Sequence, residues 1–317
     1  DHILGFDEIE VSKEDTKCKL AEKWIPKTVV DSELQVNEND TQIHIKGREF
    51  AYTIDKRTAL FTEMKFAGRE YLNHPMELNI WRAPTDNDMY IKSEWKKAHY
   101  DKAYTRAYTT EVVQGKHGVK ITSHASVVAE TVQKILDVTI TWKIDASGKI
   151  DADIEATKDG EFPDLPRFGV RMFLDKKLSA ARYFGMGPQE SYCDKHQAAS
   201  HGLYRADVGD LHEDYIRPQE NGSHYDCEYV ELNNSRYGIV ASAEKAFSFN
   251  ASYYTQEELE KKTHNYEFIE SDSVVFCVDY ALNGIGSNSC GPVVLEQYRF
   301  DDVLFRFQFT LIPYVKG

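Results

Sequence analysis

Cysteine is scarce in this sequence: 317 residues contain five, and no two of them form a CxxC pair. They stand at Cys18, Cys193, Cys227, Cys277 and Cys290. An odd, dispersed set of cysteines indicates neither a disulfide framework nor a zinc knuckle. The simplest compartment for such a chain is the reducing cytosol, so we expect a cytoplasmic protein.

Positive charge and long apolar runs are also lacking. Lys and Arg number 38 against 52 Asp and Glu, which gives a net charge of −14. A chain with this charge repels phosphate, so a nucleic-acid partner is not expected. No apolar run approaches the roughly 20 residues that a membrane span requires, so a membrane protein is not expected either. The length suits one large all-β domain or two ordinary ones.

Alternating apolar residues dominate what is present. Every second residue is apolar over 136–144, and the same alternation runs over 150–156 after the turn residues 146–148. A period of two is that of a strand with one buried face, and two such strands joined by a turn predict a hairpin. Further strands are predicted at 43–45 and at 305–311, where Phe and Leu alternate with polar residues.

Helices are expected to be few and short. The sequence Thr-Gln-Glu-Glu at 255–258 is a capping box, which predicts one or two helical turns. A second short helix is predicted over about 93–102, with Trp95 and His99 on one face at i,i+4 spacing. With strands elsewhere, the predicted architecture is all-β, a large antiparallel sandwich of two sheets.

The first polar cluster is Trp-Arg-Ala-Pro-Thr-Asp-Asn-Asp at 81–88, after an apolar strand expected at 76–81. Its Pro and three Asx residues are typical of a turn. Asp86 and Asp88 are two residues apart, so in an extended loop both carboxylates can face the same way, as an acid/base pair or as ligands for sugar hydroxyls. In the alternative, which the residues alone favour, the Asx side chains bond the turn's own backbone and Arg82 pairs with one of them.

Three further polar clusters follow along the chain. Gly-Met-Gly-Pro-Gln-Glu-Ser-Tyr at 185–192 predicts a tight turn and not a phosphate loop, because neither a helix nor a Lys-Ser/Thr pair follows. Arg-Pro-Gln-Glu-Asn-Gly at 217–222 contains a preferred turn pair. The segment 284–292 predicts a flexible loop, in which Cys290 has no neighbouring base that would make it a nucleophile. Histidines and acidic residues within 194–214 match no common metal-site spacing, so no metal site is predicted.

Taken together and in this order, the clusters WRAPTDND at 81–88, GMGPQESY at 185–192, RPQENG at 217–222 and GIGSNSCGP at 284–292 resemble the C-terminal domain of bacterial β-galactosidases of glycoside hydrolase family 2. Some bacteria encode this domain separately, as the β-galactosidase small chain. The resemblance extends over residues 34–317. It implies a large two-sheet supersandwich, the fold of galactose mutarotases, with few short helices.

The resemblance also divides the chain. Residues 1–33 are expected to hold the closing strand of a preceding immunoglobulin-like domain, followed by a polar linker at 12–32, and residues 34–317 to form the supersandwich domain. Because the sequence begins at Asp1 and not at Met, we expect the C-terminal portion of a longer polypeptide more than a natural small subunit.

The family hydrolyses terminal β-D-galactosides such as lactose with two glutamates, an acid/base and a nucleophile about 5 Å apart. Both glutamates, with magnesium and sodium, lie in a (β/α)₈ barrel domain, whose alternating βα pattern this sequence lacks. The resemblance therefore implies no catalytic residue, cofactor or metal in this chain, which alone is expected to be inactive. Its expected partners are the β-galactoside and the rest of the enzyme, in the same chain or in a large subunit, and the full enzyme is expected to be oligomeric.

What the resemblance assigns to this domain is one wall of the active-site pocket, formed by two loops on the same rim. The expected pocket residues are Asp86, Asn87, Asp88, Met89, Tyr90, Asn288, Ser289 and Cys290. In some relatives the second loop bears a Trp under the aglycone sugar, and Cys290 takes that place here.

Two alternatives stay open at this point. A free-standing aldose mutarotase needs a Glu base and a His acid that face one pocket. An autonomous carbohydrate-binding module exposes a row of Trp or Tyr.

Overall fold

The structure is a computed structural model, and it describes three stretches of the chain: residues 8–9, 34–131 and 134–316. The linker and most of the strand expected within residues 1–33 lie outside the described residues, as do Cys18 and Trp24. All described strands belong to two sheets, and every pairing between them is antiparallel. The predicted all-β, antiparallel two-sheet architecture is confirmed.

The smaller sheet has five strands in the order β1-β2-β3-β4-β5. These are β1 (Gln35–Glu38), β2 (Gln42–Lys46), β3 (Phe50–Asp55), β4 (Leu60–Phe66) and β5 (Arg69–Glu70). In β2 the predicted alternation holds, because Ile43 and Ile45 are buried while the residues that follow each of them are exposed.

The larger sheet has twelve strands, along the path β13-β12-β14-β15-β17-β10-β9-β8-β7 with β16, β11 and β6 branching from β15. They are β6 (Leu72–Asn79), β7 (Tyr104–Gln114), β8 (Gly118–Val128), β9 (Leu136–Asp145), β10 (Ile150–Lys158), β11 (Arg167–Asp175), β12 (Ala180–Gly187), β13 (Ser200–Asp207), β14 (Ser223–Asn233), β15 (Tyr237–Ser252), β16 (Ser273–Leu282) and β17 (Leu304–Val315). The predicted hairpin is the β9–β10 pair, and the predicted C-terminal strand is β17, beside β10.

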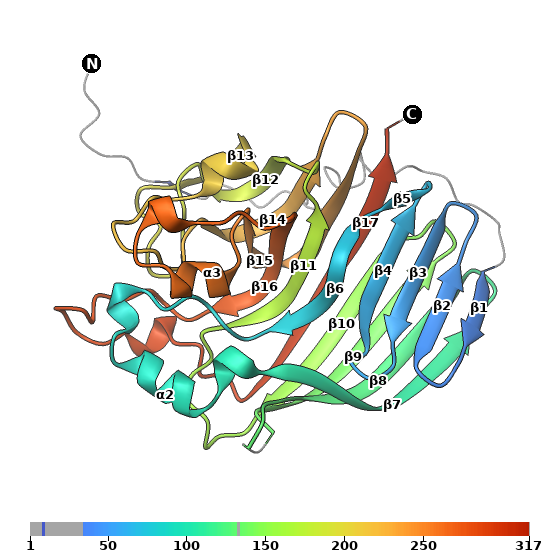
Figure 1. Cartoon of the computed structure of the whole chain (residues 1–317), viewed down its shortest axis with the longest axis horizontal. Helices are drawn as coiled ribbons and strands as arrows, with labels where there is room; N and C mark the ends of the chain where they lie inside the picture. Colours follow the sequence, from blue (N-terminus) through green and yellow to red (C-terminus); the bar gives the residue numbers. More distant parts are fainter. Residues whose placement is uncertain (1–7, 10–33, 132–133, 317) are drawn as a thin grey trace.

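The core lies between the two sheets, where β1 to β5 cover β7 to β10 (Figure 1). Trp142 of β9 is buried there, and its indole N–H donates to the Ala59 carbonyl at 2.8 Å. Its ring meets Phe61 edge to face, with ring centroids 4.9 Å apart. Such aromatic pairs contribute about 0.5–1.5 kcal/mol beyond the area that they bury. The alternating residues that predict the strands are thus the residues that join the sheets.

Two short α-helices occur in the described residues, α2 (Ile91–Lys97) and α3 (Gln256–Lys261). Single 3₁₀ turns are η1 (Asp86–Asp88), η2 (Tyr100–Lys102), η3 (Val208–Leu211), η4 (Asn265–Glu267) and η5 (Glu296–Tyr298). One half of the predicted capping box starts α3, because the Thr255 hydroxyl accepts from the Glu258 backbone N–H at 3.1 Å. The Glu258 carboxylate accepts instead from the Ile269 backbone N–H at 2.8 Å. None of the helices in this described part is long and apolar enough to cross a membrane.

The helix predicted over 93–102 was placed wrongly. It begins at Ile91 and ends at Lys97, and His99 adopts a left-handed conformation with φ 57°. Trp95 and His99 therefore do not share a helix face. A break at this point lets the chain re-enter a 3₁₀ turn that buries Tyr100, so tertiary packing overrides the i,i+4 pattern.

The tight turn predicted within 185–192 forms, but not at its glycines, because Gly185 and Gly187 lie inside β12. A Cβ at Gly185 would stand 2.3 Å from the Cys227 sulfur and 2.8 Å from its Cα, so only glycine lets β12 and β14 approach this closely. The chain turns after Pro188 instead.

Candidate functional site

The loop after β6 is built on a buried ion pair. Arg82 is fully buried and Asp88 is 2% exposed. Two parallel contacts join them, from Nη2 to Oδ1 at 2.8 Å and from Nε to Oδ2 at 3.2 Å. The Asp88 carboxylate also accepts from the Thr85 backbone N–H at 2.9 Å and hydroxyl at 3.1 Å. The favoured interpretation of the 81–88 cluster, a self-bonded turn paired with Arg82, is confirmed.

Arg82 stays charged although it is enclosed. Burial by itself lowers the pKa of Arg82, but the charge and hydrogen bonds of Asp88 outweigh it, and the pKa lies above its usual range. The guanidinium also lies 5.3 Å from the ring centroid of Trp95, a buried residue of α2. A fully satisfied bidentate pair of this kind fixes loop geometry, because moving either partner leaves a charge buried without a counter-charge.

Arg82 also holds the second predicted loop. Its Nη1 donates to the Asn283 carbonyl, and its Nη2 donates to the Gly284 carbonyl at 3.1 Å. These acceptors lie about 200 residues further along the chain, at the point where β16 ends and the 284–292 loop begins. One guanidinium therefore sets the position of both loops.

Asn87 bridges the two loops at the surface. Its side-chain N–H donates to the Gly286 carbonyl at 2.7 Å, and its side-chain oxygen accepts from the Ser289 hydroxyl at 2.7 Å. Figure 1 shows the segment that enters α2 beside the loop that follows β16. The predicted placement of Cys290 on the rim of the Asp86–Tyr90 loop is confirmed. We call Asp86–Tyr90 with Asn288–Cys290 the rim site.

The rim site presents five exposed side chains to solvent: Asp86, Met89, Tyr90, Ser289 and Cys290. Met89 is 42% exposed and Tyr90 61% exposed, and Cys290 is exposed beside Ser289. Asp86 is exposed, and Asn288 is partly buried. Asp86 and Asp88 are not a free carboxylate pair, because Arg82 engages only Asp88 and buries it.

The segment 217–222 forms hydrogen bonds to the Asp86–Tyr90 loop and to the residues that precede it. The turn residues in its sequence did not predict this role. The Gln219 side chain accepts from the Asp86 backbone N–H at 2.8 Å, and the Glu220 backbone N–H donates to the Ala83 carbonyl at 3.0 Å. Both side chains are buried although the sequence is polar. The polar turn predicted at 217–222 is therefore largely buried and supports the Asp86–Tyr90 loop.

A second buried charge group, which the sequence reasoning missed, lies behind this segment. Arg167 contacts Asp279 with Nη2 to Oδ2 at 2.6 Å and Nε to Oδ1 at 3.1 Å, and Glu220 with Nη1 to Oε1 at 3.2 Å. All three are buried. Burial by itself lowers the pKa of Arg167, but Asp279 and Glu220 outweigh it and hold the pKa well above its usual value. A signal existed: Asp279 is the single charge in the apolar strand β16.

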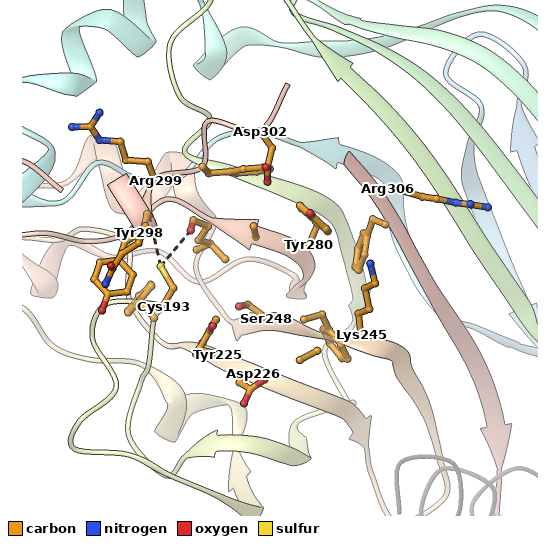
Figure 2. A pocket seen from close by; sticks show the side chains of 18 of the residues that line it. Cys193, Tyr225, Asp226, Lys245, Ser248, Tyr280, Tyr298, Arg299, Asp302 and Arg306 are labelled. Carbon is orange, nitrogen blue, oxygen red and sulfur yellow. Dashed lines mark hydrogen bonds between the residues drawn. The ribbon is translucent and has the colours of Figure 1, made fainter. Parts of the chain in front are cut away.

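A cavity of about 390 Å³ lies beside the rim site, where β16 and β17 separate (Figure 2). Its wall contains Cys193, whose thiol contacts the carbonyls of Leu282 and Tyr298 at 3.8 Å each. Tyr298 in turn accepts from the Gly284 backbone N–H at 2.8 Å, which connects this wall to the rim loop. We call this cavity the fork cleft. No histidine is among its lining residues.

Metal-ligating residues do not gather in the described stretches. Among residues 8–9, 34–131 and 134–316, no group of three or more His, Cys, Asp or Glu side chains could hold a metal ion. Asp194 is one of the acidic residues within 194–214 whose spacing matches no common metal site. Its carboxylate accepts from the backbone N–H groups of Ile285 and Gly286 at 2.9 and 2.7 Å. It stabilises the rim loop from the other side.

Curated relatives of this chain are much longer proteins. A β-galactosidase of Actinobacillus pleuropneumoniae is 43% identical over 313 residues, which is 98% of this chain and 30% of the relative. A β-galactosidase of Staphylococcus xylosus is 32% identical over 282 residues, 89% of this chain and 28% of the relative. The chain thus spans less than a third of the relatives that it matches.

Among solved structures, a galactose 1-epimerase from Lactobacillus acidophilus NCFM is similar with a TM-score of 0.46 and 10% identity, covering 90% of this chain and 99% of that one. The family model described as the β-galactosidase small chain matches residues 46–311. This match covers most of the residues for which the resemblance was predicted. The chain therefore belongs to the β-galactosidase small-chain family.

Proposed function

We propose that this chain forms one wall of the active-site pocket of a β-galactosidase, an enzyme that hydrolyses terminal β-D-galactosides such as lactose. The observation that carries the proposal is the rim site in a member of this family. Two loops about 200 residues apart are joined by Asn87 and anchored by Arg82, and together they present Met89, Tyr90 and Cys290 to solvent. A rigid base under exposed side chains is what a pocket wall requires.

The chemistry is assigned to the rest of the enzyme. Retaining hydrolysis needs two free carboxyl groups about 5 Å apart, whereas the rim carboxylate of Asp88 is committed to Arg82. We therefore place the two glutamates, with magnesium and sodium, in a barrel domain in the same chain or in a large subunit. The division at residue 33, an oligomeric full enzyme and a cytoplasmic location belong to the same proposal. The four described cysteines are all unpaired, which supports the last of these.

The surface next to the rim supports contact with another domain. From the end of the rim loop to the first residue of β17, four apolar side chains are each more than half exposed: Val293, Leu295, Val303 and Leu304. A concentration of exposed apolar side chains marks an interaction surface more often than chance does. We assign it to the interface with the part of the longer protein that the relatives contain and this chain does not.

The two alternative functions fit the geometry less well. A mutarotase needs a histidine acid beside a glutamate base, and no histidine lines the fork cleft. A carbohydrate-binding module exposes a row of Trp or Tyr, whereas the three described tryptophans, Trp81, Trp95 and Trp142, are buried. The described tyrosines that are more than half exposed, Tyr90, Tyr108 and Tyr266, lie on separate segments and form no row.

The proposal predicts that the 317-residue chain alone does not hydrolyse a chromogenic β-galactoside, because it lacks the two glutamates. Adding the remaining part of the enzyme should restore turnover. Hydrolysis by the chain alone, abolished by replacing a carboxylate within it, would show that the catalytic residues are here after all.

A second prediction concerns Cys290→Trp in the assembled enzyme. A flat indole stacks on a pyranose ring, so glucose should bind about two- to tenfold more tightly as the aglycone. Hydrolysis of a nitrophenyl galactoside should change less than glucose inhibition does. Cys290→Ser is the matched control, since it removes the thiol without adding a ring. Equal effects of the two variants would place residue 290 away from the aglycone.

A further inference from the structure

Strand β15 pairs with β17 along its first part and with β16 along its last part. Between these two parts, β16 and β17 separate from each other. The pairing of β15 with β17 ends at Ser242 opposite Thr310, and its pairing with β16 begins at Ser248 opposite Asp279. Residues 243–247 lie between these two registers. Because β17 continues along β10 while β16 continues along β11, the three strand edges separate at this point.

The fork cleft fills this gap. Its lining comes from β14, β15, β16 and β17 and from the segments at 192–193 and 297–302 (Figure 2). A volume of about 390 Å³ falls within the range of small-molecule pockets. Backbone groups on separated strand edges need water or a ligand as partner.

Several polar groups of the cleft have no hydrogen-bond or ion-pair partner among the described residues. The hydroxyls of Tyr225, Tyr280 and Tyr298 form no hydrogen bond there, and Glu244, Lys245 and Asp302 form neither a hydrogen bond nor an ion pair. A group of unengaged hydroxyls and charges around one cavity is the arrangement of a polar ligand site.

The remaining charge selects against anions. Arg306 is engaged by Asp153 through two contacts at 2.7 and 2.5 Å, and the Arg299 Nε donates to the Val294 carbonyl. The lining then holds three carboxylates, from Asp226, Glu244 and Asp302, against the two cations of Lys245 and Arg299. The Arg299 guanidinium keeps its charge but points away from the other labelled side chains (Figure 2), and Asp226 lies 3.9 Å from the His201 imidazole. Carboxylates accept from hydroxyl donors and repel phosphate, so the chemistry suits a neutral polyol.

Aromatic rings supply the apolar part of the site. Tyr280 is partly buried and stacks on Phe305 with centroids 5.2 Å apart and planes 15° apart, which fixes the orientation of its ring. Phe307 lines the same cavity. Fixed rings bind the C–H faces of a pyranose, while carboxylates and tyrosine hydroxyls bind its hydroxyl groups.

We propose that the fork cleft binds a neutral mono- or disaccharide. The proposal goes beyond the pocket-wall function, because the cleft shares no residue with the rim site and its lining needs no other part of the enzyme. Two adjacent residues lie between the cleft and the rim site. Asp194 accepts from the backbone of the rim loop, and Cys193 contacts the wall of the cleft.

The test is calorimetric titration of the 317-residue chain with galactose, glucose and lactose, with galactose 6-phosphate as the anionic counterpart. At least one neutral sugar should bind, and the phosphorylated sugar should bind more weakly than galactose. Removing one hydrogen bond to a charged group, in Asp302→Asn, should weaken binding about tenfold. Tyr280→Phe should also weaken it. Asp301→Asn, the adjacent exposed carboxylate outside the lining, is the matched control and should leave binding unchanged.

Ala246→Trp fills the cleft from an exposed position, so it should abolish binding while the far-ultraviolet spectrum and the melting temperature stay those of the parent chain. Three results would overturn the proposal: no binding of any neutral sugar, tighter binding of the phosphorylated sugar, or loss of binding in Asn87→Ala with no loss in Ala246→Trp. The last would move the sugar to the rim site. Each result is independent of whether the assembled enzyme is a β-galactosidase.

Discussion

Replacing Arg82 by methionine is expected to lower the free energy of unfolding by about 3–5 kcal/mol, since it leaves Asp88 buried without a counter-charge. The same change frees the Asn283 and Gly284 carbonyls. Amide hydrogen exchange over 284–290 should therefore rise more than exchange in β9. Urea unfolding followed by circular dichroism gives the first quantity, and mass spectrometry gives the second.

The double variant Arg82→Met with Asp88→Leu is the control for this prediction. Replacing both partners of a buried pair by apolar residues of similar size is often close to neutral, so much of the lost stability should return. The exchange at 284–290 should stay high, because the carbonyls remain without their donor. A single variant within about 1 kcal/mol of the parent chain would contradict the role given to Arg82.

Replacing Arg167 by methionine is expected to be still more damaging, because two buried carboxylates, Asp279 and Glu220, lose their shared partner. The loss should reach or exceed about 3–5 kcal/mol near pH 8. Burial raises the pKa of both carboxyl groups, an effect that the guanidinium opposes in the parent chain. Without Arg167, folding should favour their protonated forms.

The pH dependence of this variant follows from the upward direction of these two pKa shifts. A group whose folded pKa is raised contributes stability below its unfolded pKa and loses it as pH rises through the folded pKa. The destabilisation of Arg167→Met relative to the parent chain should therefore shrink as pH falls from neutrality towards the unfolded carboxyl pKa values. Arg306→Met removes an exposed bidentate pair with Asp153 and should show a far smaller change. That change should stay constant over this pH range, because Arg306 lowers the pKa of Asp153, which therefore titrates below the range. A pH-independent loss in Arg167→Met would mean that the carboxylates are hydrated.

Local pattern predicted the all-β architecture and a minority of the described strands, for a physical reason. Strands with one buried face alternate along the sequence, so β9, β10 and β17 were predicted correctly from residues within each strand. The fork at β15 carries no such signal, because a change of partner is decided by the register of strands far away in the sequence. The glycines of β12 were assigned to a turn because a turn and a close approach of two strands both require glycine.

The rim site, too, was predicted from the sequence only in part. Arg82 and Asp88 are six residues apart, so their pairing was foreseeable from composition. The resemblance, and not the residues, predicted that the 284–292 loop would meet them. Glu220 lies in a cluster that is polar throughout, and nothing local distinguishes its buried carboxylate from an exposed one.

The central claim is that the rim site faces the bound galactoside, and Cys290 can report on it directly. Among the described cysteines it alone is exposed. Burial raises the pKa of Cys193 to about 11 and that of Cys277 to about 12, and Cys227 is fully buried, so these thiols should react slowly. Peptide mapping separates Cys290 from Cys18.

The measurement is the rate of Cys290 alkylation by iodoacetamide in the assembled enzyme, with and without a non-hydrolysable S-linked galactosyl-glucose. When nine tenths of the sites are filled, alkylation should slow by about tenfold. The same sugar, at the same concentration, should not protect Cys290 in the 317-residue chain alone. Equal alkylation rates in the assembled enzyme with and without the sugar would contradict the account, because the rim site would then lie away from the substrate.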